Sequence, residues 1–174
     1  MKLFALLSLS LVPLSIFATD IHDAVNAGNI EKVKTLLSQG KDINSQMQNG
    51  RTPLHIAAFH GDAKIIRFLL DQHANVNARA NDGITPLHRA AEGGDIQAIE
   101  LLISKGAKVN STSSDLVTPL HIAAYIGNDQ AALTLIQHGA DINAKNTDGN
   151  TPLQEAQDAE ELKTVKALQA LALK

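Results

Sequence analysis

Apolar residues recur along the chain in short stretches with helical spacing, and polar segments that contain glycine separate these stretches. The clearest example is residues 85–106, where two apolar stretches flank Gly94. In the first stretch, the residues that share a face are Leu87, Ala90 and Ala91. In the second stretch, they are Ile96, Ile99, Leu102 and Ile103. Because residues three and four positions apart lie on one side of an α-helix, this segment predicts two short helices that are separated at Gly94 and end near Gly106.

Turn and capping residues mark where this predicted helix pair begins. Residues 81–83 read Asn-Asp-Gly, and the glycine favours a turn because it adopts a positive φ at no steric cost. Thr85 has the side chain of an N-cap, and Pro86 suits the first helical position, where its missing N–H costs nothing. After the second helix, residues 107–114 are predicted to return as a polar extended loop.

The whole unit recurs with a period of 33 residues. Its helix start reads TPLHIAA at 52–58, TPLHRAA at 85–91, TPLHIAA at 118–124 and TPLQEAQ at 151–157. Further series keep the same spacing: Asn44, Asn77, Asn110 and Asn143; Ile43, Val76, Val109 and Ile142; and Gly28, Gly61, Gly94 and Gly127. Five units therefore fill residues 19–174 without an insertion.

The TPLHxAA heptapeptide, the central glycine and the later Gly-Ala-Asp-Ile-Asn-Ala of residues 139–144 resemble the ankyrin repeat. The resemblance covers residues 19–174 and implies an all-α repeat solenoid, in which stacked helix-turn-helix units carry hairpin-like loops on one side. It also implies an N-terminal cap repeat, three internal repeats and a C-terminal cap repeat, at residues 19–48, 49–81, 82–114, 115–147 and 148–174.

A single pair of short helices cannot cover its own apolar face, so neighbouring units must bury one another. Alanine pairs keep the first helix of each unit thin at this contact, at 57–58, 90–91 and 123–124. In the last unit Gln157 replaces the second alanine and Glu160 replaces the central glycine, so we expect a polar outer face that ends the stack. From this cap Leu162, Val165 and Leu168 are predicted to face inward.

Before the last unit, two further residues stand where the pattern predicts glycine. His73 occupies the end of a second helix, and histidine tolerates the left-handed conformation better than most residues. Leu116 replaces the turn glycine, so its loop either turns differently or is strained. We expect the tip of this loop to expose Leu116 and Val117.

Residues 1–18 have the layout of a secretory signal peptide. Lys2 precedes an apolar run that extends from Leu3 to Phe17 and ends at Ala18, before polar residues. The run is shorter than the roughly 20 apolar residues that cross a bilayer, which disfavours a retained anchor. It also lacks the polar face that a buried N-terminal helix would turn to water. We therefore expect cleavage after Ala18 and export to the periplasm or the medium.

Charge, cysteine content and motifs exclude several functions. The net charge is -3 without a dense run of Lys or Arg, so we expect no nucleic acid and, after signal removal, no membrane contact. The absence of cysteine excludes disulfides, iron–sulfur clusters and thiol catalysis. The sequence lacks G-x-S-x-G, H-E-x-x-H and phosphate-loop motifs, so we expect no enzyme and no cofactor. The charged terminal units argue against end-to-end stacking and favour a monomer.

His55, His88 and His121 occupy the same position in successive units. Stacked helices lie about 8–10 Å apart, whereas zinc ligands lie about 2 Å from their ion, so these side chains cannot share a metal. We expect each imidazole to hydrogen-bond the backbone of a neighbouring loop, which is also the role that the resemblance implies. The Asn-Ser-Thr glycosylation sequon at 110–112 begins within the periodic asparagine series, which favours a structural role for Asn110.

Residues that break the period are candidates for binding a partner. In ankyrin-repeat proteins the partner usually meets the loop tips and the exposed end of the first helix. Phe59 and Tyr125 stand at the same repeat position, and aromatic and arginine side chains are frequent binding hot spots. The alternative is that these rings only pack on adjacent loops. The candidate partner-binding residues are Arg51, Phe59, His60, Ile84, Glu92, Val117, Tyr125 and Ile126.

These features favour an exported, non-enzymatic protein–protein interaction module that binds or protects a partner protein in the periplasm. A secreted effector that binds a host protein is the alternative within the same class. An enzyme is less favoured because a thin two-layer solenoid offers no obvious pocket of convergent titratable groups. A structural oligomer is less favoured because both terminal units are charged.

Overall fold

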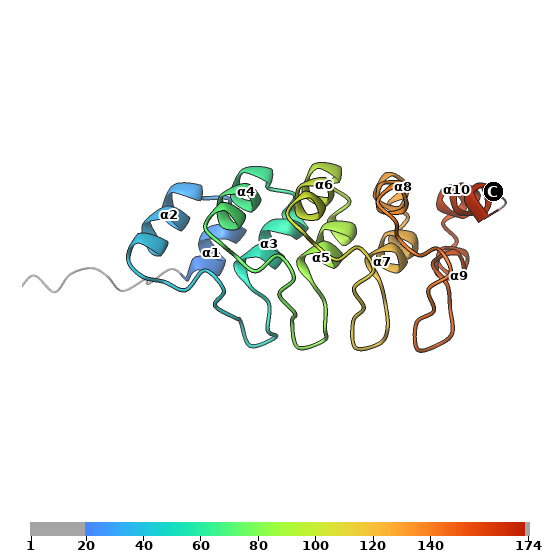
Figure 1. Cartoon of the computed structure of the whole chain (residues 1–174), viewed down its shortest axis with the longest axis horizontal. Helices are drawn as coiled ribbons and strands as arrows, with labels where there is room; N and C mark the ends of the chain where they lie inside the picture. Colours follow the sequence, from blue (N-terminus) through green and yellow to red (C-terminus); the bar gives the residue numbers. More distant parts are fainter. Residues whose placement is uncertain (1–19, 173–174) are drawn as a thin grey trace, which may run out of the picture.

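The computed structural model describes residues 20–172, so the expected signal peptide at 1–18 lies outside the described residues. Within the described part, the chain forms ten helices and no strand, which confirms the predicted all-α repeat solenoid (Figure 1). The helices are α1 Ile21–Asn26, α2 Ile30–Ser38, α3 Pro53–His60, α4 Ala63–Asp71, α5 Pro86–Gly93, α6 Ile96–Ser104, α7 Pro119–Ile126, α8 Asp129–Gln137, α9 Pro152–Asp158 and α10 Leu162–Ala172.

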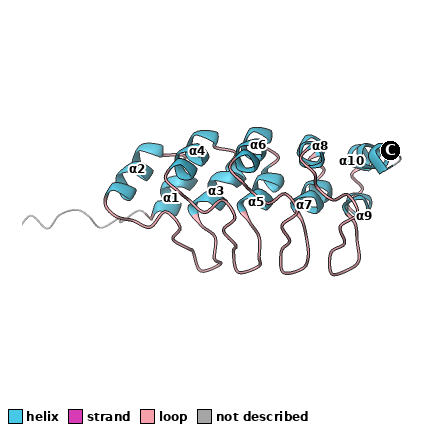
Figure 2. Cartoon of the chain, viewed as in Figure 1, coloured by secondary structure: helices cyan, strands magenta, loops and turns pink. Residues whose placement is uncertain are grey.

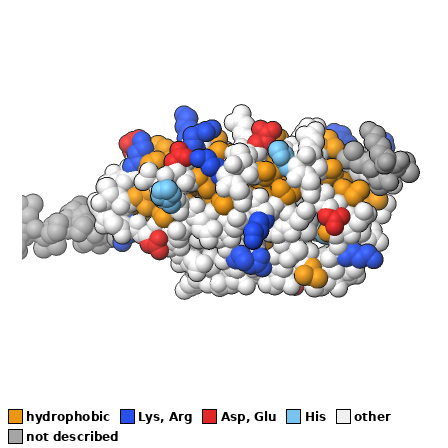
Figure 3. Space-filling model, in the orientation of Figure 1, with side chains coloured by type: hydrophobic (Ala, Val, Ile, Leu, Met, Phe, Trp, Pro, Cys, Tyr) orange, Lys and Arg blue, Asp and Glu red, His pale blue; other side chains and the backbone are white. Residues whose placement is uncertain are grey.

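The helices form two layers, and the long loops all project from the same side (Figure 2). The odd-numbered helices α1 to α9, called here the inner helices, lie next to the loops. The even-numbered helices α2 to α10, the outer helices, form the opposite edge (Figure 1). On the face shown in Figure 3, basic and acidic side chains lie intermixed along the outer helices. Two ion pairs at the outer helices are Lys34–Glu31, at 2.8 Å, and Lys105–Asp71, at 2.7 Å.

The predicted helix starts are correct, and each threonine cap uses the residue three positions later. In α7, Thr118 Oγ1 accepts from the His121 N–H at 3.3 Å, and His121 Nδ1 accepts from the Thr118 N–H at 3.2 Å. This reciprocal pair satisfies two donors that the first helical turn would otherwise leave unbonded. A proline follows each threonine cap of α3, α5, α7 and α9, and Gly94 ends α5 with a left-handed φ of 74°.

Alanine pairs lie at the contacts between successive inner helices, as predicted. Ala90 and Ala91 of α5 are completely buried, and the corresponding pairs of α3 and α7 are buried to the same extent. At Gly93 an added Cβ would collide with the carbonyl oxygen of Phe59, so α3 and α5 approach as closely as their backbones permit. Leucine and isoleucine side chains fill the space between the two layers, including Leu87, Ile99 and Leu102. Adjacent repeats therefore share one continuous apolar core.

Hydrogen bonds between consecutive loops hold them at the 33-residue spacing. The backbone N–H groups of Asn81, Ser114 and Thr147 donate to Asn49, Asp82 and Asp115 carbonyls, at distances of 3.0, 2.8 and 3.0 Å. The periodic asparagines add side-chain bonds between repeats. Asn110 accepts from the Asp141 N–H at 2.8 Å and donates to the Gly139 carbonyl at 2.9 Å. The amide of Asn110 is thus part of the repeat contact, as its place in the series predicted.

Three residues that replace glycine, namely His73, Leu116 and Glu160, adopt a left-handed backbone, and Glu160 of the last repeat has a φ of 60°. His73 has a φ of 65°, as expected from its position at the end of α4. Leu116 has a φ of 58°, so its loop keeps the turn at the expense of backbone strain rather than turning differently. Leu116 is 48% exposed, as predicted. Val117 was also predicted to be exposed at the loop tip, but it is half-buried. Its carbonyl, which accepts a hydrogen bond from His88 Nε2 at 3.0 Å, holds the residue against the neighbouring repeat.

The C-terminal repeat has the expected polar outer face, although one apolar residue is placed differently. Gln157 and Glu160 are exposed, and Leu168 is buried against Ala124 and Ala156. Leu162 was predicted to face inward, but it is 72% exposed. The residues of α10 that face inward include Thr164 and Leu168, four positions apart. Thr164 is fully buried, and its hydroxyl donates a hydrogen bond to Asp129.

Candidate partner-binding surface

The surface between the loops and the inner helices contains two separate hollows. The N-terminal hollow, of about 270 Å³, lies between the first three repeats. The C-terminal hollow, of about 250 Å³, lies between the fourth and fifth repeats. The N-terminal hollow is lined by Asn26, Met47, Asn49, Arg51, His55, Ile56, Phe59, His60 and Arg89. The C-terminal hollow is lined by Val117, His121, Ile122, Tyr125 and Glu155.

Phe59 lines the N-terminal hollow and contacts polar side chains of its own and the next repeat. The Arg89 guanidinium carbon lies 4.2 Å from the centre of the Phe59 ring, which is a favourable cation–π distance. The His60 ring meets the Phe59 ring edge-on, with 5.4 Å between their centres. His60 Nε2 is hydrogen-bonded to Asn26 Oδ1 of the first repeat at 2.9 Å. Phe59 is half-buried, and its ring contacts His60 of its own repeat and Arg89 of the next repeat.

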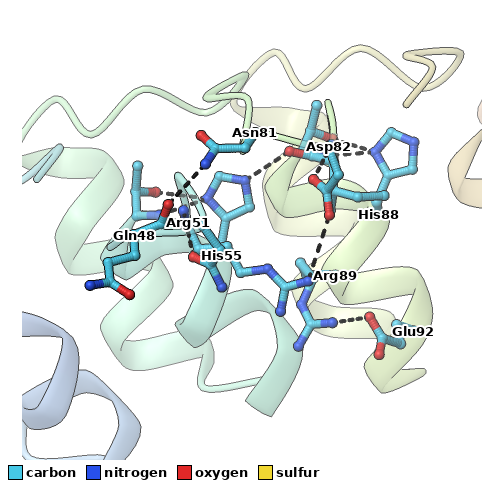
Figure 4. Close-up of polar contacts among 12 residues, drawn as sticks. Gln48, Arg51, His55, Asn81, Asp82, His88, Arg89 and Glu92 are labelled. Atoms are coloured by element: carbon cyan, nitrogen blue, oxygen red, sulfur yellow. Dashed lines mark hydrogen bonds and ion pairs between the residues drawn. The ribbon is translucent and has the colours of Figure 1, made fainter. Parts of the chain in front are cut away.

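Two arginines from successive repeats lie beside one another at this hollow (Figure 4). Arg51 Nη2 lies 3.8 Å from Asp82 Oδ2, and Arg89 Nη1 forms an ion pair with Glu92 (Figure 4). Partial burial lowers the pKa of Arg89, as does the nearby charge of Arg51, although the neighbouring Glu92 opposes both effects. A guanidinium group nevertheless remains charged at neutral pH. The hollow thus combines an aromatic ring with two fixed positive charges.

The C-terminal hollow is more apolar and has an anionic border. Tyr125 is 57% exposed, and Val117 and Ile122 are half-buried. Glu155 Oε1 accepts from the side-chain amides of Asn146 and Asn150, at 2.7 and 3.2 Å. This hollow therefore offers apolar contacts and a carboxylate that is already hydrogen-bonded.

The structure brings together only some of the sequence-predicted residues. Arg51, Phe59 and His60 line the N-terminal hollow, and Val117 and Tyr125 line the C-terminal hollow. The other three line neither. Half-buried Ile84 uses its carbonyl to accept from His55 Nε2 at 3.0 Å, Glu92 pairs with Arg89, and Ile126 is 43% exposed at the end of α7.

Sequence reasoning missed Arg89, which contacts Phe59 across the boundary between repeats. The available signal was the variable position of the TPLHxAA segment, where Arg89 stands between the isoleucines of the preceding and following repeats. It also missed Met47, which is 45% exposed at the edge of the hollow. Met47 lies in the first loop, outside the repeated heptapeptides, so the period gives no signal for it.

The periodic histidines serve the repeat contacts, as predicted. His55, His88 and His121 are buried, and each Nε2 lies 3.0 Å from a carbonyl of the next loop. Since each Nδ1 accepts from a threonine N–H, Nε2 must carry the proton. Burial lowers the pKa of His55 and of His88 to about 4, and it also lowers the pKa of His121. Neutral imidazoles with both nitrogens bonded are structural groups.

Other features of the described residues bear on ligand and membrane binding. Over residues 20–172, His, Cys, Asp and Glu side chains form no group of three that could hold a metal ion. In the same part of the chain, each helix is too short or too polar to cross a membrane.

Comparison with protein families agrees with this architecture. A family model described as ankyrin repeats (3 copies) matches residues 21–113, and one described as ankyrin repeats (many copies) matches residues 102–156. The chain therefore belongs to the ankyrin-repeat family. A search of curated proteins found no match. Ankyrin repeats are generally non-enzymatic scaffolds, and they identify the chain as a protein–protein interaction module.

Proposed function

We propose that the chain is an exported module whose loop-side surface holds or protects a partner protein in the periplasm. The observation that carries the proposal is the placement of Phe59 and Tyr125. These two aromatic side chains occupy the same position two repeats apart, and each lines a hollow between an inner helix and its loops. Large aromatic side chains in partly desolvated pockets are typical anchors of protein interfaces.

The two hollows set the size of the partner segment. Inner helices of stacked repeats lie about 8–10 Å apart, so two repeats separate the hollows by roughly 20 Å. An extended segment rises about 3.3 Å per residue, so roughly six residues span this distance. A single short segment of a folded or unfolded partner is therefore long enough to fill both hollows.

Export is supported by the pattern of residues 1–18, which places one lysine before an apolar run and ends it at Ala18. The partner is accordingly expected in the periplasm, with the medium or a host cell as the alternative destination. Detection of the tagged protein in periplasmic, medium and host fractions distinguishes these destinations.

Crosslinking in the native compartment, followed by mass spectrometry of attached proteins, tests the binding surface. We expect the Phe59→Ala plus Tyr125→Ala variant to lower partner capture by at least about tenfold, which corresponds to 1.4 kcal/mol. Phe68→Ala is the matched control because Phe68, the remaining aromatic residue after position 18, lies on outer helix α4. Thermal unfolding of each variant verifies the fold. Undiminished capture by the folded double variant would exclude this surface.

A further inference from the structure

The N-terminal hollow contains hydrogen-bond donors that have no acceptor among the described residues. Arg51 Nε and Arg89 Nε are both buried, and each lacks a hydrogen-bond partner in this part of the chain. A buried donor without an acceptor costs about 1–3 kcal/mol. Two arginines from adjacent repeats therefore line one hollow with donors that the described residues do not use.

The carboxylates next to these arginines leave most of the guanidinium donors unused. Asp82 Oδ2 is 3.8 Å from Arg51 Nη2, which is beyond hydrogen-bond distance, while Asp82 Oδ1 accepts from the Ile84 N–H at 3.0 Å. Arg51 thus makes no side-chain hydrogen bond within residues 20–172. Arg89 uses Nη1 for Glu92, and its guanidinium rests on the Phe59 ring. Both guanidinium groups therefore retain Nη donors, and a pair of such donors binds a carboxylate through two parallel bonds.

The remaining polar groups of the hollow favour a negatively charged ligand. Asn49 Oδ1 accepts from the Arg51 N–H at 3.1 Å, so the side chain of Asn49 has its amide N–H groups left to donate. Both ring nitrogens of His55 are already bonded. The apolar part of the lining consists of Met47, Ile56 and Phe59. This combination suits a carboxylate that arrives on an aliphatic side chain.

The acidic residues around the hollow do not block such a ligand. Asp82 is exposed, and its loose contact with Arg51 would be exchanged for a two-point contact with the incoming carboxylate. Glu92 keeps its single bond to Arg89 Nη1, and Nη2 of Arg89 has no hydrogen bond within residues 20–172. In contrast, Glu155 in the C-terminal hollow disfavours an acid there, and the lining residues Val117, Ile122 and Tyr125 favour an apolar side chain.

We propose that the N-terminal hollow binds an Asp or Glu side chain of an extended segment of the partner protein, through Arg51 and Arg89. This inference rests on the proposed function and specifies the chemistry of the partner. An apolar side chain roughly six residues away in the same segment occupies the C-terminal hollow, since extended chain rises about 3.3 Å per residue. The segment therefore has a direction, with its acid at the first repeats and its apolar residue at the last.

Selection from a random-peptide display library against the folded domain tests this assignment. We expect the enriched peptides to share an Asp or Glu and an apolar residue at this spacing. Binding of one enriched peptide is then measured by fluorescence anisotropy against Arg51→Gln and Arg51→Lys. We expect both variants to bind at least about tenfold more weakly, because lysine keeps the charge but lacks the planar pair of donors.

Arg67→Gln is the matched control because it removes the same charge from outer helix α4, where Arg67 is exposed. This control is expected to change the peptide affinity by less than about twofold, as a distant screened charge should. Replacing the acid of the peptide by its amide should weaken binding to the wild-type protein about tenfold but cause no further loss with Arg51→Gln. Such coupling identifies the two groups as direct partners.

The outcomes separate this inference from the proposed function. Peptides without an acid that lose affinity with Phe59→Ala plus Tyr125→Ala, but not with Arg51→Gln, would overturn the carboxylate site and leave the docking surface intact. Binding that is insensitive to all these variants, or a selection that yields no binder, would overturn both. Peptide binding by the Arg89→Gln variant is interpreted only together with its thermal unfolding curve, because Arg89 also packs on Phe59 and its loss can destabilise the fold.

Discussion

The heptapeptides of the third and the fifth repeats both begin Thr-Pro-Leu but differ at the fourth residue. In the third repeat, His88 is buried, its Nδ1 accepts from the Thr85 N–H at 3.1 Å, and its Nε2 donates to the next loop. In the fifth repeat, the exposed Gln154 makes only the first of these bonds, from the Thr151 N–H to Oε1 at 2.8 Å. Glutamine is sufficient there because no described repeat follows it.

The same difference recurs at the alanine pair and at the central glycine. Ala91 and Gly94 face the fourth repeat, and a Cβ at Gly94 would lie 3.0 Å from the side chain of Asn128. Their counterparts Gln157 and Glu160 are exposed. Among the periodic residues, those that contact a following repeat are the ones replaced in the fifth repeat, which no described repeat follows. Substitutions that exchange residues between the two repeats test this explanation.

Acidification should produce the largest effect, because protonation breaks the histidine contacts of several repeats at once. Burial lowers the pKa of His55 and of His88 to about 4 in the folded chain, whereas an unfolded histidine titrates near about 6.5. Above about pH 6.5 these histidines are neutral in both the folded and the unfolded chain, so their full contribution to stability is present. Below it only the unfolded chain takes up protons, so stability falls until the folded histidines also titrate.

Between pH 7 and pH 5 we expect the free energy of unfolding to fall by roughly 2 kcal/mol for each of these two histidines. Urea unfolding followed by far-UV circular dichroism at several pH values measures this loss. The His88→Gln variant is the control and should show a shallower dependence on pH. A free energy of unfolding that stays constant across this interval would contradict the buried neutral state.

Introducing the residue of the fifth repeat into the third should produce the next largest effect. Ala91→Gln forces a long amide into a completely buried position, where overpacking and an unbonded polar group together cost about 2–5 kcal/mol. The reverse change, Gln157→Ala, acts on an exposed side chain and should alter stability by less than about 0.5 kcal/mol. Equal losses from the two changes, measured by urea unfolding, would show that the two surfaces are equivalent.

A smaller loss is expected when only the bond to the next repeat is removed. His88→Gln supplies an acceptor for the Thr85 N–H but loses the donor to the Val117 carbonyl, so we expect about 1–2 kcal/mol of destabilisation. Gln154→His should change stability by less than about 0.5 kcal/mol, since the position is exposed. If His88→Gln left the free energy of unfolding unchanged in the same assay, the hydrogen bond from His88 to the Val117 carbonyl would contribute nothing to stability.

The smallest effect, and one of opposite sign, is expected at Leu116. Leu116→Gly removes a left-handed leucine and an exposed apolar side chain, so we expect stabilisation by about 0.5–1 kcal/mol. Gly83, at the same position of the preceding loop, is the matched comparison. An added Cβ there would lie 2.8 Å from the Ser114 nitrogen, so Gly83→Ala should destabilise. Destabilisation by Leu116→Gly would indicate that the leucine makes a contact worth more than its strain.

The repeat architecture was predictable because it depends on local signals that recur. Threonine caps, alanine pairs, asparagines and glycines each act at a fixed position, so the period alone identifies the helices, the loops and the polar cap. The exposure of Leu162 was not predictable in this way, since no described repeat follows α10 and its inward face is set by Thr164.

The candidate site was only partly predictable, because it depends on contacts between repeats. The position of Phe59 on the loop side follows from the period. Its contact with Arg89, 30 positions later in the chain, depends on the orientation of two side chains and the distance between two helices. Likewise, the unused donors of Arg51 follow from where Asp82 is held by its own loop. Sequence spacing does not determine these orientations.

The most direct test of the central claim is a nitrogen-15 NMR titration of the histidine side chains. The claim is that neutral, buried histidines join each internal repeat to the next. It predicts that His55 and His88 carry their proton on Nε2 and titrate near pH 4, well below the unperturbed value of about 6.5. Titration near 6.5, or a proton on Nδ1, would contradict it.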